Sequence, residues 1–114
     1  MLRLVAELEQ TEPVKRAGRP IRGLRAEVVD GPDRGMHAEA NSASLTIGTS
    51  PGNDLVVTDP TVSRYHLELR RDASSIVVED LQSTNGTGLP SGSQMAFVNR
   101  GSVPSGKTIR FGCR

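Results

Sequence analysis

The strongest constraint on the fold is a period of two in the apolar residues after residue 20. In the segment 24–29, Leu24, Ala26 and Val28 alternate with other residues, and a turn-forming run at 30–35 follows. Side chains of a β-strand point alternately to opposite faces, so this pattern predicts half-buried strands. No stretch of ten residues after residue 20 keeps a helical period, and we therefore expect an all-β fold, a two-sheet antiparallel β-sandwich. The expected strands are 24–29, 36–40, 45–47, 55–57, 65–71, 76–78, 95–98 and 108–111.

The first twenty residues are interpreted differently. Leu4, Val5 and Leu8 fit one or two turns of an amphipathic helix, a length that is marginal by itself. Residues 11–20 contain two prolines, a glycine and three basic residues, which is typical of a linker. We therefore predict that residues 1–20 form a flexible basic arm and that residues 21–114 form the folded domain.

Charge and composition exclude several classes of function. Residues 1–25 hold six basic and three acidic residues, whereas the rest of the chain holds eight basic and ten acidic residues. A slightly acidic domain with three aromatic residues lacks both the phosphate-neutralising charge and the stacking platforms of a nucleic-acid binder. Neither a signal peptide nor an apolar run of the ~20 residues that a membrane helix needs is present. We expect no nucleic-acid or membrane binding by this domain, and a cytoplasmic location.

Three polar loops lie between the apolar segments, and they are rich in Gly, Ser, Thr and Asn. Small hydroxyl and amide side chains, with exposed backbone N–H groups, are suited to hold an anion by hydrogen bonds. The three loops carry the motifs Gly48…Asn53-Asp54, Ser63-Arg64-x-His66 and Ser83-x-Asn85-Gly86-Thr87. Together these motifs resemble the signature of forkhead-associated (FHA) domains, which are β-sandwiches of the FHA/SMAD-like type that bind phosphothreonine peptides.

The resemblance implies a role for each residue at one end of the sandwich. Ser63 and Thr84 would donate hydrogen bonds to the phosphate, and Arg64 would add a backbone or side-chain contact. Asn85 would hold the peptide backbone, and Thr61 would face the residue three positions after the phosphothreonine. A phosphate dianion is a strong acceptor for such donors.

The resemblance also implies structural positions, and it extends from about residue 24 to residue 112. His66 would tie neighbouring loops together without touching the ligand, and Gly48 and Gly86 would support the loops. The family usually has one more strand after the equivalent of Phe111-Gly112. We therefore expect that the domain 21–114 lacks its last strand and that the chain is a fragment of a longer protein.

One position departs from the family pattern. Gly48 is normally followed by an arginine that clamps the phosphate, and here Thr49 follows it. A hydrogen bond to a charged group contributes ~1.5–3 kcal/mol, so its loss weakens binding about tenfold or more. Thr49 is then a weaker phosphate contact. The alternative is a phosphate-independent docking module on the same fold.

Ordinary structural roles are also open to these residues. Hydroxyl and carboxylate side chains often complete turns, and glycines often supply a positive φ. On this interpretation Ser63 and Thr84 cap turns, Gly48 and Gly86 supply φ > 0, and Asp54, Asp59 and Asp80 form Asx-turns. The joint spacing of the three motifs favours the binding interpretation.

No enzyme, cofactor or metal is expected. A hydrolytic triad of Ser63, His66 and Asp80 would lack the Gly-x-Ser-x-Gly elbow of such enzymes. The two histidines and Cys113 have no metal-ligand spacing.

The segment 47–55, preceded by a basic arm, resembles the amino-terminal FHA module of bacterial sigma-54-dependent transcriptional regulators. That resemblance implies a AAA+ ATPase and a DNA-binding domain in the full-length protein, with a phosphothreonine-containing protein as partner.

Overall fold

The computed structural model describes residues 2–10, 22–40, 44–72, 75–91 and 94–112, and every regular element in these ranges is a strand. The all-β prediction is confirmed. No helix in these ranges is long and apolar enough to cross a membrane. The strands are β1 (Leu2–Gln10), β2 (Arg22–Asp30), β3 (His37–Ala40), β4 (Ser44–Gly48), β5 (Leu55–Val56), β6 (Leu67–Asp72), β7 (Ser75–Asp80), β8 (Thr87–Ser91), β9 (Gln94–Phe97), β10 (Arg100–Pro104) and β11 (Lys107–Phe111).

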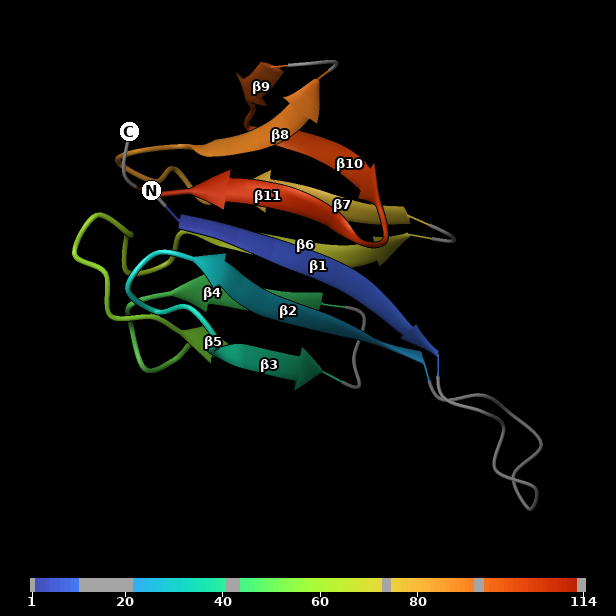
Figure 1. Cartoon of the computed structure of the whole chain (residues 1–114), viewed down its shortest axis with the longest axis horizontal. Helices are drawn as coiled ribbons and strands as arrows, with labels where there is room; N and C mark the ends of the chain where they lie inside the picture. Colours follow the sequence, from blue (N-terminus) through green and yellow to red (C-terminus); the bar gives the residue numbers. More distant parts are fainter. Residues whose placement is uncertain (1, 11–21, 41–43, 73–74, 92–93, 113–114) are drawn as a thin grey trace.

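The strands form two sheets that pack face to face (Figure 1). The six-stranded sheet has the order β3-β2-β1-β11-β8-β9, and the five-stranded sheet has the order β10-β7-β6-β4-β5. The pairs are antiparallel except β4–β5, which is parallel, with Ile47 opposite Leu55. The sandwich is therefore mixed at one edge, where the sequence analysis expected only antiparallel pairs.

The core lies between the two sheets and is made by the inward members of the alternating segments. Leu24, Ala26 and Val28 of β2 are fully buried, as are Leu45 and Ile47 of β4 on the facing sheet. Complete burial of one such aliphatic side chain stabilises the fold by about 1.5–3 kcal/mol. The same alternation turns the alternate side chains of these strands away from the core.

The prediction of a flexible arm was wrong for residues 2–10. This segment is β1, which lies in the middle of the six-stranded sheet between β2 and β11 (Figure 1). Leu2, Leu4 and Ala6 are fully buried, so the segment has the period of a strand. Leu4, Val5 and Leu8 fit a helical face equally well, and a short apolar run does not distinguish the two periods. Residues 11–21 lie outside the described residues.

Two further strands, β8 and β10, were not expected. β8 contains Pro90, which has no backbone N–H to donate to a neighbouring strand. This is tolerated on the side of β11, because the pairing of β11 with β8 includes only Thr87 and Gly88. β10 forms an edge of its sheet, where a terminal proline is tolerated. Since β1 and β8 occupy both sides of β11, a strand following Phe111 has no open place beside β11 in the described part of the chain. That the domain lacks its last strand stays a prediction.

Candidate functional site

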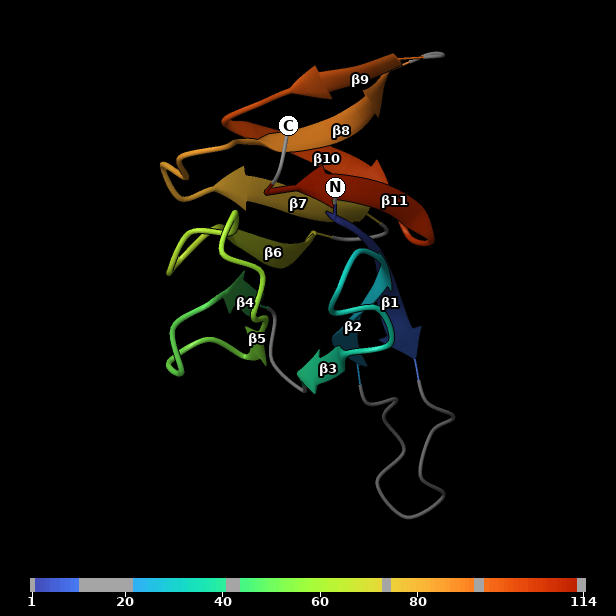
Figure 2. The same ribbon diagram turned by 60° about the vertical axis from the view of Figure 1, so that its left-hand side comes forward.

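Three loops meet at one end of the sandwich, and direct hydrogen bonds join them. The Thr84 backbone N–H donates to Ser63 Oγ at 3.0 Å, and the Thr49 N–H donates to the Ser63 carbonyl at 3.1 Å. Asn85 Nδ2 donates to the Thr61 carbonyl at 2.8 Å. In Figures 1 and 2 the β5–β6 and β7–β8 loops project from the same end of the molecule. The structure thus brings together residues that lie up to 36 positions apart, from Thr49 to Asn85.

The β4–β5 loop is held against the β5–β6 loop by a buried amide. Asn53 Nδ2 donates to the carbonyls of Ser50 and Arg64, at 2.9 and 2.7 Å. Gly48 lies so close to the Arg64 carbonyl that a side chain there would overlap it. Gly48 therefore provides space for a close approach of two backbones, which is a different use of glycine from a positive φ.

Hydrogen bonds to two buried carboxylates, those of Asp59 and Asp33, fix the β5–β6 loop. Asp59 Oδ1 accepts from the backbone N–H and the hydroxyl of Thr61, at 2.8 and 2.6 Å. Asp33, on the β2–β3 turn, accepts from the Thr58 N–H and hydroxyl and from the Asp59 N–H. These bonds fix the backbone that carries Thr61 and Ser63.

The β7–β8 loop is closed by Asp80. Its carboxylate accepts from the Ser83 N–H and hydroxyl and from the Thr87 hydroxyl, at 2.9, 2.5 and 2.6 Å. Burial pushes the pKa of Asp80 upward, but the bonds from Ser83 and Thr87 outweigh it and hold the pKa below its ordinary value of 3.8. Gly86, with φ of +87°, completes the turn and donates its N–H to Ser83 Oγ.

His66 connects the two loops beneath the site. The side chain is fully buried, and its ring meets the Phe111 ring edge to face at 5.7 Å. Nδ1 accepts from the Ser63 N–H at 3.1 Å, so the proton is on Nε2, which donates to the Gly86 carbonyl at 2.8 Å. Both nitrogens of His66 are therefore engaged by backbone groups.

Burial lowers the pKa of His66 below its ordinary value of 6.5, and the bond to Gly86 opposes this only in part. The folded state thus favours the neutral ring, whereas the unfolded chain takes up a proton near pH 6.5. The stabilisation is complete above that pH and is lost as the pH falls from there toward the folded-state pKa. A proton on Nδ1 would also remove the acceptor of the Ser63 N–H.

We expect the free energy of unfolding to fall as the pH drops below about 6.5, with a slope of at most about 1.4 kcal/mol per pH unit. Urea titrations over this range measure it. His66→Gln should remove most of the slope, and His37→Ala, which changes the exposed histidine, should retain it. If the slope instead disappeared in His37→Ala and persisted in His66→Gln, the assignment of the pH dependence to His66 would be wrong.

Four donor groups remain free at the meeting point of the loops. Among the described residues, no partner accepts from the hydroxyls of Thr49 and Thr84 or from the Arg64 guanidinium. Ser63 Oγ accepts from Thr84 but still has its own proton to donate. Arg64 and Thr84 are exposed, whereas Ser63 and Thr49 are half-buried. Such a group of donors can bind an anionic ligand through charge-assisted hydrogen bonds.

The geometry does not form a hydrolytic triad. A triad needs His66 to accept a proton from the Ser63 hydroxyl and to be oriented by a carboxylate. Instead His66 is bonded to two backbone groups, and the Asp80 carboxylate is bonded to Ser83 and Thr87. Within the described ranges, no group of three His, Cys, Asp or Glu side chains could hold a metal ion.

Sequence reasoning missed Asp33, which belonged to a segment interpreted only as a turn. No local signal identifies its role, because its partners are 25 and 26 residues away in the chain. Asp59 and Asp80 do form the short-range turn contacts considered for them. Asp54 instead accepts from Thr46, eight residues away across the β4–β5 connection.

A β-sandwich whose end loops carry free hydroxyl and guanidinium donors has the architecture of a binding module. The chain belongs to the FHA domain family, whose model matches residues 45–112.

Similar proteins agree with this assignment. The oxoglutarate dehydrogenase inhibitor of Corynebacterium diphtheriae is 40% identical over 57 residues, which are 50% of this chain and 40% of that protein. The glycogen accumulation regulator GarA of Mycobacterium tuberculosis is 35% identical over 75 residues, covering 66% of this chain and 41% of the relative. The chain thus spans about two fifths of these relatives. A solved structure from a study of phosphothreonine-dependent FHA domain interactions matches with a TM-score of 0.60 and 26% identity, over 96% of this chain and 88% of that chain.

Proposed function

We propose that this chain is a phosphothreonine-peptide-binding signalling module of a larger regulatory protein. The observation that carries the proposal is that the loops bearing the free donors of Thr49, Ser63, Arg64 and Thr84 meet at Ser63. A phosphate offers several acceptor oxygens and about two negative charges, which suit these donors. The similar structure described as phosphothreonine-dependent supports the same ligand.

Within this proposal each residue has a part. Ser63, Thr84 and Arg64 bind the phosphate, and Thr49 adds one hydroxyl. Asn85 uses one amide hydrogen on the Thr61 carbonyl and keeps its remaining polar capacity for the peptide backbone. Thr61 faces the residue three positions after the phosphothreonine. Asn85 and Thr61 are thus coupled to one another before any peptide binds.

The second candidate is a phosphate-independent docking module, and Thr49 is the observation that favours it. A threonine hydroxyl replaces the planar guanidinium that the family usually has there, and it carries no charge. Calorimetric titration with one peptide in phosphorylated and unphosphorylated forms distinguishes the two functions. Phosphate-dependent binding supports the first, and equal affinity for both forms leaves only the second.

We expect Thr49→Arg to tighten phosphopeptide binding about tenfold, because it restores a charge-assisted contact of ~1.5–3 kcal/mol. The wild type should bind weakly, with a Kd of roughly tens of micromolar or higher. Arg64→Ala should weaken binding further, because Arg64 is the one guanidinium in the proposed set of donors. Isothermal titration calorimetry measures all three proteins.

Thr49→Lys is the matched control, because it adds a positive charge without the planar fork of arginine. A smaller gain for lysine than for arginine would assign the effect to hydrogen-bond geometry. An equal gain for the unphosphorylated peptide would contradict the phosphate contact.

The larger protein also belongs to this proposal. A sigma-54-dependent regulator, with AAA+ and DNA-binding domains, stays a prediction from the sequence resemblance. The two relatives described above are named for enzyme inhibition and for regulation of glycogen accumulation, and neither name refers to transcription. Sequencing of the gene beyond the codon for Arg114 tests this context, and a following AAA+ domain would support it.

A further inference from the structure

A hollow lies beside the proposed phosphate-binding residues, between the β7–β8 loop and the β9–β10 connection. It has a volume of about 450 Å³, and its lining includes Asp80, Thr84, Asn85, Phe97, Val98 and Asn99. Pockets that accept small ligands or side chains have volumes of about 300–1,000 Å³. The hollow is thus large enough to bury part of a ligand.

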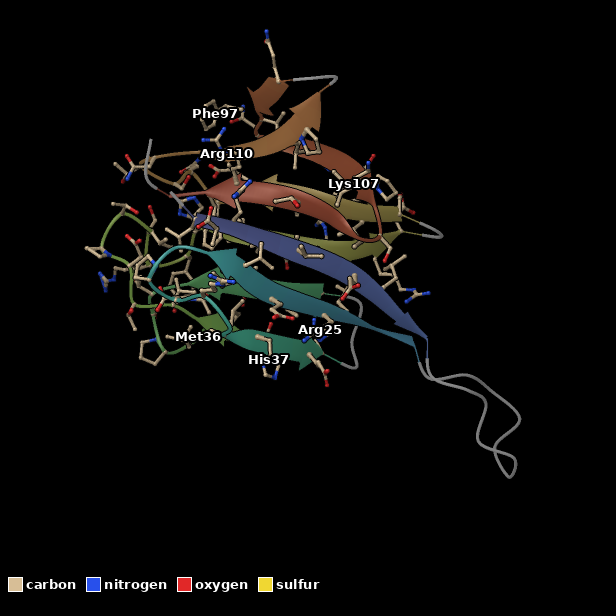
Figure 3. The ribbon with its side chains drawn as sticks, viewed as in Figure 1. Arg25, Met36, His37, Phe97, Lys107 and Arg110 are labelled. Carbon is tan, nitrogen blue, oxygen red and sulfur yellow. The ribbon has the colours of Figure 1, made fainter. Side chains whose placement is uncertain are left out.

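Phe97 is the most exposed large apolar side chain among the described residues, with 65% of its surface accessible. It ends β9, an edge strand of the six-stranded sheet, and Figure 3 shows it near the end of the molecule that carries the loops. A Cβ on Gly86 would lie 3.1 Å from Phe97 Cδ1, so the ring lies directly against the residue that follows Asn85. The absence of a side chain at Gly86 therefore makes room for the ring.

Backbone hydrogen bonds hold both walls of the hollow. The Val98 N–H donates to the Thr87 carbonyl at 3.0 Å, and the Asp80 N–H donates to the Asn99 carbonyl at 2.8 Å. These bonds join the β9–β10 connection to both ends of the β7–β8 loop. The hollow is therefore formed before a ligand arrives, which reduces the entropy lost on binding.

The lining of the hollow is mixed, with polar and apolar surface in similar amounts. The carboxylate of Asp80 already accepts from Ser83 and Thr87, so its acceptor atoms are occupied. The apolar part of the lining is the exposed aromatic ring of Phe97, with the half-buried Val98 beside it. An exposed aromatic ring contributes most to binding free energy when an apolar group of the ligand covers it. The charge of Asp80 also disfavours an acidic ligand group.

We propose that this hollow binds an apolar side chain of the same phosphothreonine peptide and so determines which phosphorylated sequences are selected. The inference rests on the proposed function. Thr84 and Asn85 line the hollow and also belong to the proposed phosphopeptide site, so the two sites are continuous. Thr61, the partner of Asn85, is not among the residues that line the hollow, so the hollow is separate from the Thr61 contact. A peptide held at Asn85 can contact Phe97 with a neighbouring side chain.

The test is calorimetric titration of the wild type with phosphothreonine peptides in which each flanking position is Ala or Leu in turn. At one position Leu should bind about tenfold more tightly than Ala, as expected for a side chain on an aromatic anchor. Phe97→Ala should abolish this preference, so that the Leu and Ala peptides bind with equal affinity. Phe97→Tyr, which keeps the ring, should retain it.

Met36→Ala is the matched control. Met36 is an exposed apolar residue beside β3, at the opposite edge of the six-stranded sheet from Phe97 (Figure 3). This variant should keep the preference, and thermal melting verifies that all variants are folded. Phosphate-dependent binding without a Leu preference, or a preference that survives in Phe97→Ala, would overturn the inference and leave the proposed function intact. Equal affinity for the phosphorylated and unphosphorylated peptides would overturn both the inference and the proposed function.

Discussion

Gly48→Ala should destabilise the domain by about 3 kcal/mol or more, which lowers the Tm by roughly 15 °C. The added Cβ would overlap the Arg64 carbonyl oxygen, would lie 2.7 Å from the carbonyl carbon and would lie 2.9 Å from Asn53 Nδ2. Two of these three atoms belong to the backbone, so relief requires the two loops to separate. Such a shift would stretch the hydrogen bond of 2.7 Å between Asn53 and the Arg64 carbonyl. Thermal and urea unfolding measure the loss.

Gly52→Ala is the matched control in the same loop. A Cβ there would meet the hydroxyl of Tyr65 at 2.9 Å. That hydroxyl is the far end of a half-exposed side chain, which can move aside, so we expect a loss of at most about 1 kcal/mol. If both variants melted alike, the close approach at Gly48 would not be the constraint. Gly48→Ala should also weaken phosphopeptide binding, because Arg64 belongs to the proposed site.

The strands of the sandwich were predictable wherever apolar residues alternate with other residues over a stretch long enough to exclude a helix. β2 and β3 were expected as strands on either side of a turn, and they pair with Ala26 opposite Ala38. β1 has the same alternation, but Leu4, Val5 and Leu8 also fit a helical face, and the basic, proline-containing segment after it favoured a linker. Its burial depends on pairing with β11, at the other end of the chain, which no local pattern encodes.

The candidate site was predictable to the extent that its residues lie in motifs. Ser63, Thr84 and Asn85 were identified by spacing, and they meet in space. The support beneath them was not predictable. Asp33 binds residues on another loop, and Phe97 lies against Gly86 because β9 pairs with β8, a strand that the sequence analysis did not expect. Such contacts depend on tertiary packing, and residue types at a given spacing do not specify them.

Asp33→Ala should cost about 3 kcal/mol of stability. Asp33 is only 5% exposed, and its removal leaves the Thr58 N–H, the Thr58 hydroxyl and the Asp59 N–H without an acceptor. A hydrogen bond to a charged group contributes ~1.5–3 kcal/mol, and the three bonds share one side chain, so their contributions are not additive. Urea unfolding measures the loss.

Binding should weaken together with stability, because Asp33 acts on the ligand through other residues. It holds the Asp59 backbone, Asp59 holds Thr61 through two bonds, and the Thr61 carbonyl holds Asn85. Asp33 is therefore a positioning residue. Asp33→Ala should reduce phosphopeptide affinity several-fold even at temperatures where the protein remains folded, a loss that titration calorimetry detects.

Asp33→Asn separates geometry from charge. An asparagine oxygen can accept from the two backbone N–H groups in place of Oδ2, and its amide can donate to the Thr58 hydroxyl in place of Oδ1. All three contacts then survive and only the charge is lost, so we expect a cost of about 1 kcal/mol and nearly unchanged binding. An Asn variant as unstable as the Ala variant would show that the negative charge holds the loop. An Ala variant as stable as wild type would show that the loop does not depend on Asp33. The hydrogen bonds that lead from Asp33 through Asp59 and Thr61 to Asn85 would then not contribute to stability.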